Sequence, residues 1–351
     1  MPGRAGMTDD PALDTLFLPF RNGTLTWPEE GRALLLGARA GAALAEFASP
    51  ALACEQSFRP RATALEAAGL TVSTRVEGRF PLVLVLPPRQ REAARALLAR
   101  ALDQAEPGGM VVVSLANTDG ARSVEEDLER LAGPVESLSK NRCRVFWVRA
   151  GAGDPALRAE WSALDVPRPV ADGRFLSRPG LFAWDRIDPG SALLAAHLPA
   201  DLKGQGADLG AGFGYLAAEV LDRCPEVASI DLYEAEARGL ELARRNLEPH
   251  AGRFALDFLW HDVAAGLPRD RRYHFIVTNP PFHEGGRADR HDLGRAFITA
   301  AAAALRQKGR LFLVANRHLP YEATLEQTFV MVRRIADDGT YKVIEASKGV
   351  R

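Results

Sequence analysis

The segment 278–283, Thr-Asn-Pro-Pro-Phe-His, contains residue types that can bind a planar amine. It follows the apolar run 275–277 and is therefore expected at the end of a strand. The two prolines stiffen the loop, and the residue before a proline is biased toward extended geometry, which directs the Asn279 carboxamide outward. Asn279 and the Pro280 carbonyl can accept both hydrogens of an –NH2 group while Phe282 stacks on its ring. We therefore predict that Asn279, Pro280 and Phe282 are catalytic residues of an enzyme that acts on an exocyclic amine.

A glycine-rich turn upstream predicts a cofactor site. The sequence Asp-Leu-Gly-Ala-Gly-Phe-Gly at 208–214 precedes an apolar helix expected from residue 215 to residue 221. Glycines at a strand-to-helix turn let the backbone approach a ligand closely, and a helix N-terminus favours anionic groups. Gly210, Gly212 and Gly214 are predicted to contact the cofactor, and Asp208 either to orient one end of it or to cap the turn. Taken alone, this pattern also fits dinucleotide-binding folds.

Polar residues at two further strand ends help to distinguish the candidate cofactors. The strand expected at 229–233 ends at Glu234, where a carboxylate can accept hydrogen bonds from ribose hydroxyls, as NAD and S-adenosylmethionine both require. The strand at 255–260 is followed by Asp262, whose carboxylate can accept from an adenine amino group. Because the Asn279 strand comes next, the order of these groups favours S-adenosylmethionine over NAD.

The chain resembles the class I methyltransferases that modify exocyclic amines, which carry both signatures at these places. Within them it is similar to the bacterial ribosomal RNA guanine-N2 methyltransferases of the RsmC and RlmG type. Three segments carry the narrower match: Asn-Pro-Pro-Phe-His at 279–283, Ala-Asn-Arg-His-Leu-Pro-Tyr at 315–321, and Arg-Pro-Gly-Leu-Phe-Ala-Trp-Asp-Arg-Ile-Asp-Pro-Gly-Ser at 178–191. The match covers roughly residues 170–351 well and the N-terminal part in outline. Glu234 stands where the family often has Asp, which keeps the carboxylate.

The resemblance implies a function for these segments. S-adenosylmethionine would be the cofactor, and the substrate would be the N2 amine of a guanine in ribosomal RNA, with 16S rRNA of the small subunit expected first. Asp188 or Ser191 is a candidate cap for the helix expected at 192–198, and the family pattern suggests that this pair also covers the methionine part of the cofactor. Asn279 counts as a cofactor contact as well as a catalytic residue. A guanine N2 inside a helix is out of reach, so the base must be single-stranded or flipped out.

Several other functions fit parts of the pattern. Related clamps act on 23S rRNA guanine, on adenine N6 and on protein glutamine amides. A non-enzymatic alternative is an RNA-binding or assembly factor built from two inactive methyltransferase folds, although an intact Asn279 and glycine turn argue against it. His283 is expected to contact RNA phosphate or backbone, because methylation of a neutral amine needs no prior deprotonation.

The two halves of the chain repeat one order of elements. The C-terminal half runs from the Asn-Pro-Pro-Phe strand through a helix at 293–305 and Lys308-Gly309 to a strand at 310–315. The N-terminal half runs from a strand at 82–86 through Pro-Pro-Arg, a helix and Gly-Gly to a strand at 110–115. This alternation predicts an α/β protein with two tandem class I methyltransferase (Rossmann-like) domains, each ending in a β-hairpin. The expected domains are 1–160 and 165–351.

The N-terminal copy lacks the residues that carry the chemistry. Leu86 stands in the place of Asn279, and an isobutyl group cannot accept an amine's hydrogens. Arg39 and Leu35 stand in the places of Gly212 and Asp208, so the cofactor turn is also lost. We predict that this degenerate domain recognises RNA or stabilises its neighbour.

Composition limits the remaining functional classes. No window of the 351 residues approaches the roughly 18 uninterrupted apolar residues of a membrane span, and residues 1–10 lack an apolar signal core. The three cysteines are far apart, and the histidines show no ligand spacing, which argues against disulfides and metal. We expect a cytoplasmic protein, monomeric, without membrane or metal, that binds ribosomal RNA or a ribosomal subunit. The net charge of −1 predicts no overall basic surface, so local arginine groups such as Arg287, Arg290 and Arg295 are the candidate RNA contacts.

Overall fold

The computed structural model describes residues 10–151, 153–281 and 287–349, with side chains from residue 292 onward in the last segment. The chain forms two compact units, Met1–Val166 (unit 1) and Pro167–Arg351 (unit 2). Each unit contains a seven-stranded sheet, and unit 2 has an additional two-stranded sheet, β8 (Arg168–Val170) with β9 (Phe175–Ser177).

The sheet of unit 2 has the strand order β12-β11-β10-β13-β14-β16-β15. The five strands from β12 to β14 are parallel, and β16 and β15 form an antiparallel hairpin at the edge. Parallel strands covered on both faces are rich in buried apolar residues, as Phe275, Ile276 and Val277 are in β13. The strands are β10 (Lys203–Leu209), β11 (Glu226–Glu234), β12 (Ala255–Trp260), β13 (Tyr273–Thr278), β14 (Leu305–Asn316), β15 (Met331–Asp337) and β16 (Tyr341–Ser347).

Unit 1 repeats this topology, with the strand order β3-β2-β1-β4-β5-β7-β6 and the same parallel and antiparallel pairs. The predicted tandem α/β architecture and the two terminal hairpins are confirmed. The strands are β1 (Ala33–Leu36), β2 (Leu52–Glu55), β3 (Val72–Ser73), β4 (Phe80–Val85), β5 (Ala105–Ala116), β6 (Glu136–Lys140) and β7 (Cys143–Arg149).

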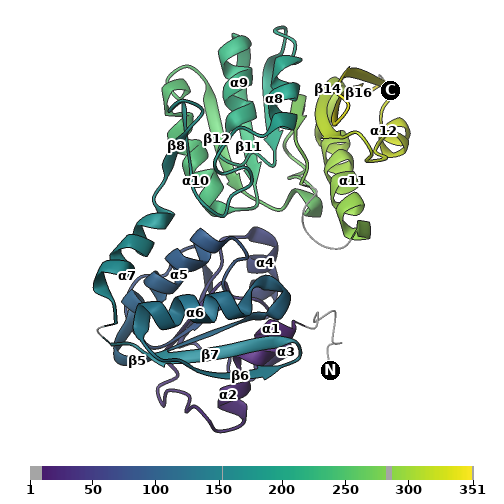
Figure 1. Ribbon diagram of the computed structural model, residues 1–351. Helices are drawn as coiled ribbons and strands as arrows, with labels where there is room; N and C mark the ends of the chain where they lie inside the picture. The colour runs from purple at the N-terminus through teal and green to yellow at the C-terminus, as the bar shows by residue number, and fades with distance from the viewer. Residues whose placement is uncertain (1–9, 152, 282–286, 350–351) are drawn as a thin grey trace, which may run out of the picture. The chain divides into compact units, whose positions relative to one another are not determined.

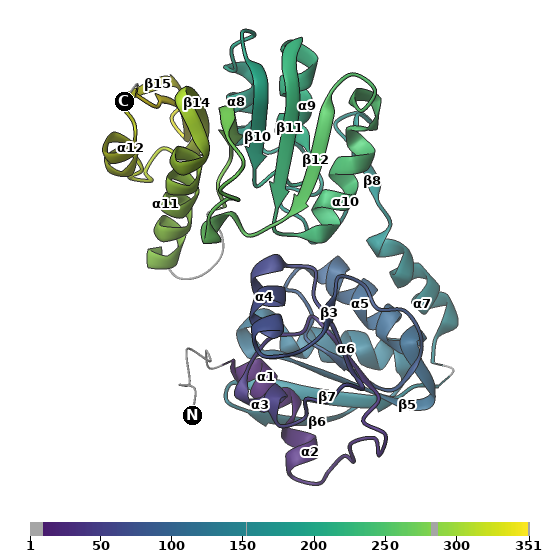
Figure 2. The same cartoon turned by 180° about the vertical axis from the view of Figure 1, so that it is seen from behind.

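Helices cover both faces of each sheet. In unit 2 one buried cluster joins the sheet to α8, α9 and α10, and a second cluster joins it to α11 and α12. Figure 1 shows α9 in front of the strands of this unit, and Figure 2 shows the strands from behind. The helices of unit 2 are α8 (Pro189–Ala196), α9 (Tyr215–Arg223), α10 (Ala237–Asn246), α11 (Arg287–Ala304) and α12 (Glu322–Thr328). Those of unit 1 are α1 (Pro11–Leu16), α2 (Leu18–Arg21), α3 (Ala42–Ala45), α4 (Arg59–Ala67), α5 (Arg91–Gln104), α6 (Ala121–Ala132) and α7 (Pro155–Ser162).

The sequence misplaces the start of one strand in each unit. Lys308-Gly309 is expected to separate a helix from a strand, but β14 already begins at Leu305 and runs through this pair. The pairing of β13 with β14 shifts register at this point, and Lys308 adopts a left-handed φ of 61°. Gly108, with a φ of 75°, makes the same irregularity in β5. The repeated turn signal therefore marks a bulge inside a strand rather than its beginning.

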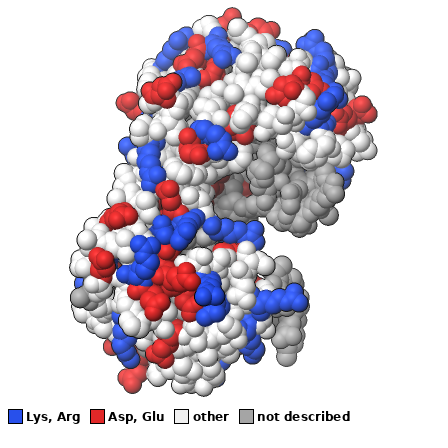
Figure 3. All heavy atoms as spheres, viewed as in Figure 1, with Lys and Arg blue, Asp and Glu red and all other residues white. Residues whose placement is uncertain are grey.

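Charges of both signs are mixed on the surface. On the face drawn in Figure 3, groups of acidic and basic side chains lie intermingled over each unit. Many described arginines pair with carboxylates; Arg271, for example, binds Asp231 and Asp257, each at 2.8 Å. This arrangement agrees with the near-zero net charge.

Candidate active site

Most of the predicted site residues of unit 2 lie in or directly after the last residues of four adjacent parallel strands. Leu209 at the end of β10 pairs with Tyr233 of β11 and with Thr278 of β13, and Tyr233 pairs with Leu259 of β12. The carboxyl ends of these strands therefore lie at one edge of the sheet, where open α/β sheets bind ligands. The residues brought to this edge are Asp208, Gly210, Gly212, Gly214, Glu234, Asp262 and Asn279.

The glycine turn after β10 adopts a backbone that only glycine takes easily. Gly210, Gly212 and Gly214 have φ values of 76°, 55° and 92°. A Cβ added at Gly212 would meet no described atom within 4 Å, so this part of the turn borders open space. Gly214 precedes α9 directly. The turn thus presents bare backbone at a helix start, which suits a closely approaching ligand.

Asp208 is fully buried beneath this turn. Its Oδ2 accepts a hydrogen bond from the backbone N–H of Ala217 at 3.1 Å, in the first turn of α9. Burial raises the pKa of this carboxyl to about 7, and among the described residues its Oδ1 has no donor. The capping interaction is therefore present, and one buried acceptor remains that suits a cationic group of a ligand.

Glu234 and Asp262 both hold backbone at the strand ends. Glu234 accepts from the N–H of Gly212 through Oε2 and from that of Glu236 through Oε1, each at 2.7 Å, and burial raises its pKa. Asp262 accepts from the N–H of Ala264 at 2.9 Å. The Glu234 carboxylate thus fixes the position of the open glycine in the turn, a contact that strand-end spacing alone does not reveal.

The Asn279 carboxamide is held by two side chains from the start of α8. Its Nδ2 donates to Asp188 Oδ2 at 2.9 Å and to Ser191 Oγ at 2.8 Å. The neighbouring Thr278 is buried, and its Oγ1 donates to Leu209 O at 2.7 Å, which fixes the end of β13 against β10. Both amide hydrogens are thus engaged within the protein, and the carboxamide oxygen is left as the acceptor.

Asp188 caps α8, as its sequence pattern predicts. Its Oδ2 accepts from the backbone N–H of Ser191 at 2.8 Å, and Pro189 occupies the first helical position. Both Asp188 and Ser191 are nearly buried. The family resemblance suggests that this pair covers part of the cofactor, and the structure shows that both side chains bond to Asn279.

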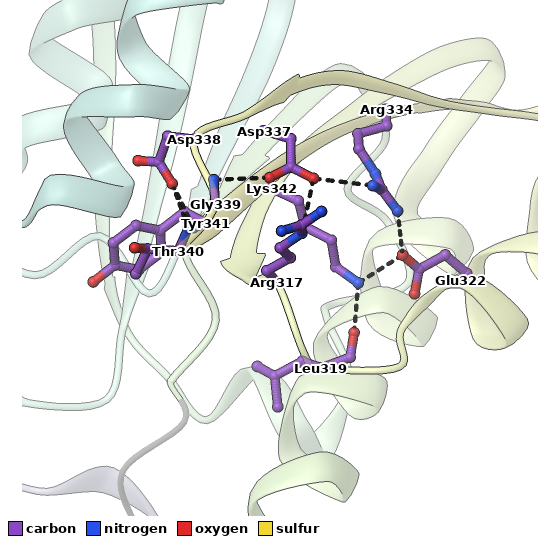
Figure 4. A network of polar contacts seen from close by, with 10 residues as sticks. All are labelled: Arg317, Leu319, Glu322, Arg334, Asp337, Asp338, Gly339, Thr340, Tyr341 and Lys342. Carbon is purple, nitrogen blue, oxygen red and sulfur yellow. Dashed lines mark hydrogen bonds and ion pairs between the residues drawn. The ribbon is translucent and has the colours of Figure 1, made fainter.

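The segment 315–321 is linked by hydrogen bonds to the hairpin that follows it, and this hairpin packs against α8. Lys342 is buried in β16, and its Nζ donates to Leu319 O at 2.7 Å and to Glu322 at 2.6 Å, as Figure 4 shows. The Tyr341 ring lies against α8, because a Cβ on Gly190 would approach it to 3.0 Å. The glycine of the Asp-Pro-Gly-Ser pattern therefore allows close packing of the helix start.

Some predicted contacts lie outside the described residues. These are Phe282 and His283, together with the side chains of Arg287 and Arg290. Within the described ranges no group of three or more histidine, cysteine or acidic residues could hold a metal ion. None of the described helices is both long and apolar enough to cross a membrane.

Comparison with known proteins identifies the family. The model of the methyltransferase small domain matches residues 172–345, within unit 2. The ribosomal RNA small subunit methyltransferase C of Shewanella halifaxensis is 30% identical over 75% of this chain and 76% of its own length. The chain belongs to the ribosomal RNA small subunit methyltransferase C family. The relative of the same name from Yersinia enterocolitica is also 30% identical, over 75% of this chain and 73% of its own.

A solved structure extends the family match to both units. It is that of the T. thermophilus 16S rRNA N2 guanine 1207 methyltransferase in complex with AdoMet and guanosine. The two chains align with a TM-score of 0.79 and 26% identity, over 99% of this chain and 97% of that one. The prediction of an RsmC-type class I methyltransferase is confirmed, including its tandem domains.

Proposed function

We propose that this member of the methyltransferase C family transfers a methyl group from S-adenosylmethionine to the exocyclic N2 amine of a guanine in 16S rRNA. The observation that carries the proposal is the orientation of Asn279, whose amide hydrogens are held by Asp188 and Ser191. Its oxygen receives no donor among the described residues and can therefore accept a hydrogen from a substrate amine. The T. thermophilus relative acts on guanine 1207, and the corresponding guanine is the proposed target here.

The residues at the sheet edge fit the proposed cofactor. The buried Oδ1 of Asp208 lacks a donor among the described residues, and the open space at Gly212 leaves room for a ligand at bare backbone. S-adenosylmethionine, when bound, supplies an electrophilic methyl group on its sulfonium. The residues proposed to hold it are Asp208, Gly210, Gly212, Gly214, Glu234, Asp262 and Asn279, with Asp188 and Ser191 close by.

The chain's own contribution to the reaction is positioning. Asn279 Oδ1 and the Pro280 carbonyl accept the hydrogens of the guanine amine and so direct its lone pair along one line. Alignment of this kind corresponds to effective molarities of about 10⁵ M or more. The same two oxygens stabilise the positive charge that grows on the nitrogen as it is alkylated. Phe282 is proposed to stack on the base, which must be unpaired or flipped out.

Unit 1 is proposed to serve the RNA rather than the chemistry. The domain limits proposed for these two roles, 1–160 and 165–351, are supported by the division into compact units at Val166. The macromolecular substrate is ribosomal RNA or a ribosomal subunit, and we propose that the protein meets it as a monomer in the cytoplasm.

Mapping of methylguanosine tests the proposal directly. Purified protein and S-adenosylmethionine are incubated with 16S rRNA or small subunits from a strain that lacks the enzyme, and the RNA is analysed by mass spectrometry. The expected result is one N2-methylguanosine at the position that corresponds to guanine 1207 of the T. thermophilus relative. Methylation confined to 23S rRNA, to adenine N6 or to a protein glutamine would contradict it.

A further inference from the structure

We infer that Asp188 and Ser191 are positioning residues that fix the orientation of the Asn279 carboxamide, rather than contacts of the methyl donor. The inference rests on the proposed function in one respect, namely that the Asn279 oxygen receives the substrate amine. The hydrogen bonds that join the side chains of Asp188, Ser191 and Asn279 can be measured in the absence of any substrate.

The Asn279 carboxamide has two chemically opposite ends. A rotation of its terminal torsion by about 180° exchanges an acceptor for a donor, and such torsions are broad and roughly two-fold. Only the orientation with the oxygen toward the substrate can accept a hydrogen from an amine. A free asparagine at a loop start would divide its population between productive and unproductive orientations.

The start of α8 removes this ambiguity. An ionised carboxylate accepts hydrogen bonds and donates none, so Asp188 Oδ2 can face only the Nδ2 end of Asn279. Ser191 Oγ receives the second amide hydrogen at 2.8 Å. In the flipped orientation the Asn279 oxygen would approach the carboxylate, and the outward-facing group would be a donor. The two contacts together therefore select the orientation that catalysis needs.

The two acceptors are themselves held in place. Asp188 Oδ2 also accepts from the backbone N–H of Ser191, so the three residues form a closed set of hydrogen bonds. The start of α8 packs tightly on β16, where Gly190 leaves room for the ring of Tyr341. Buried and mutually bonded acceptors of this kind hold an active-site group more firmly than mobile surface side chains.

Unit 1 separates the capping function of the aspartate from its positioning function. Its helix α1 also begins with Asp-Pro, and Asp10 caps it by accepting from the N–H of Ala12 and Leu13. Leu13 stands in the place of Ser191, and the second oxygen of Asp10 binds Arg39 at 3.0 Å. Unit 1, which lacks the asparagine, thus retains the helix cap but has no serine at this position, and Arg39 forms an ion pair with the Asp10 carboxylate.

Kinetics and calorimetry of Ser191 variants test the inference. Ser191→Ala should lower kcat at saturating cofactor about tenfold, the upper range for one hydrogen bond, and leave the cofactor Kd within about twofold. Ser191→Thr, which keeps the hydroxyl, should recover most of the lost rate. Ser139→Ala, at an exposed position in β6 of unit 1, is the matched control. A cofactor Kd raised about tenfold with an unchanged kcat would overturn the inference.

An exchange of groups between positions 188 and 279 provides a second test. Asn279→Asp removes both donors and places two carboxylates side by side, so we expect at least a hundredfold loss of kcat. Adding Asp188→Asn removes one of the two charges, and its amide can donate to position 279 at the expense of the bond from the N–H of Ser191, because both contacts use the same atom, Oδ2. The double variant should recover at least tenfold over Asn279→Asp. Cofactor binding reports that both proteins are folded, and a folded double variant without recovery would contradict the inference.

Hydrogen exchange of the Asn279 side-chain amide separates this inference from the proposed function. In ¹⁵N-asparagine-labelled protein without ligands, NMR should show slow exchange of both amide protons of Asn279 and faster exchange in Ser191→Ala. Exchange in the wild type as fast as that of the exposed Asn22 would overturn the inference, whatever the substrate is. Failure of the wild type to methylate guanine would instead contradict the proposed function alone.

Discussion

In unit 2 the strand β10 continues into a turn of three left-handed glycines and the nine-residue helix α9, whereas in unit 1 the strand β1 continues into Arg39 and the four-residue helix α3. Of the two glycines in this turn of unit 1, Gly37 has a left-handed φ of 71° and Gly41 is extended. The same sheet therefore supports a turn with accessible backbone in one copy and a closed turn in the other.

The register of the two sheets shows which positions correspond. Leu36 pairs with Val85 as Leu209 pairs with Thr278, and this places Leu86 at the position of Asn279. The N–H of Leu86 donates to Leu36 O at 3.0 Å, so the backbone at this strand end remains ordered although the polar side chain is lost.

The position of Glu234 shows the same replacement. Its counterpart in unit 1 is Gln56, which is buried and donates through Nε2 to Ala38 O at 2.7 Å. In unit 2 the Glu234 carboxylate accepts a hydrogen bond from the backbone of Gly212. In unit 1 the Gln56 carboxamide donates to the backbone of the turn itself. The comparison teaches that the core and topology of this fold are independent of its site, which depends on a few residues after the strand ends.

Making unit 2 resemble unit 1 should have the largest effect. Gly212→Arg copies Arg39, fills the open space and places a side chain at a φ of 55°. Strain at such a position costs about 1–3 kcal/mol and adds to the blocked approach, so the cofactor affinity should fall by more than about 100-fold. Calorimetry should show one cofactor per wild-type chain and no measurable binding to the variant. Two sites per chain, or binding retained in Gly212→Arg, would mean that the comparison between the copies is misleading.

Removal of the substrate clamp should have the next largest effect. Asn279→Ala should reduce kcat by about 30- to 1000-fold, which corresponds to roughly 2–4 kcal/mol for one oriented polar group. Cofactor affinity should change far less than kcat, because the Asn279 oxygen serves the substrate amine and the other proposed cofactor contacts remain. Single-turnover methylation with saturating cofactor measures the loss. Turnover by the alanine variant at the wild-type rate would show that Asn279 is not a catalytic residue.

Deletion of unit 1 tests whether this degenerate domain contributes to RNA binding. Residues 165–351 should bind the cofactor normally but methylate 16S rRNA weakly, because fewer phosphates are contacted. Each lost phosphate contact reduces the slope of log affinity against log salt by roughly 0.7 to 0.9. Binding titrations at several salt concentrations should therefore give weaker affinity and a flatter slope. Full activity with an unchanged slope would favour stabilisation of unit 2 as the function of unit 1.

The sequence predicts the local parts of the site well. The glycine turn, the strand before Asn279 and the cap of α8 are each encoded within a few consecutive residues, and the structure contains all three. Repetition of the element order also predicts the tandem architecture, because alternating strands and helices permit few topologies.

The relation between Asn279 and the start of α8 could not be predicted from the sequence. Its partners are 91 and 88 residues away along the chain, and they meet only because α8 packs beside the end of β13. An Asp-Pro pair predicts a helix start but does not indicate what its first turn faces. For the same reason the family resemblance suggests a cofactor role for Asp188 and Ser191 but does not reveal their hydrogen bonds to the asparagine.

The last difference between the copies concerns the pH dependence of Asp208, which has no titratable counterpart at Leu35 in unit 1. Burial raises its folded pKa to about 7, above the unfolded value of about 3.9. The folded protein therefore holds this proton between pH 4 and pH 7, and its contribution to stability is full below pH 4 and declines as the pH rises toward 7.

A bound cationic group would favour the ionised form, so cofactor affinity should increase up to tenfold per unit as the pH rises to 7 and then level off. Glu234, whose pKa burial also raises, titrates in the same direction, and the variant Asp208→Asn isolates the contribution of Asp208. Calorimetry in buffers of different ionisation enthalpy should detect release of about one proton on binding to the wild type below pH 7, and less in Asp208→Asn. An identical pH profile for the two proteins would show that Asp208 caps α9 without serving the cofactor.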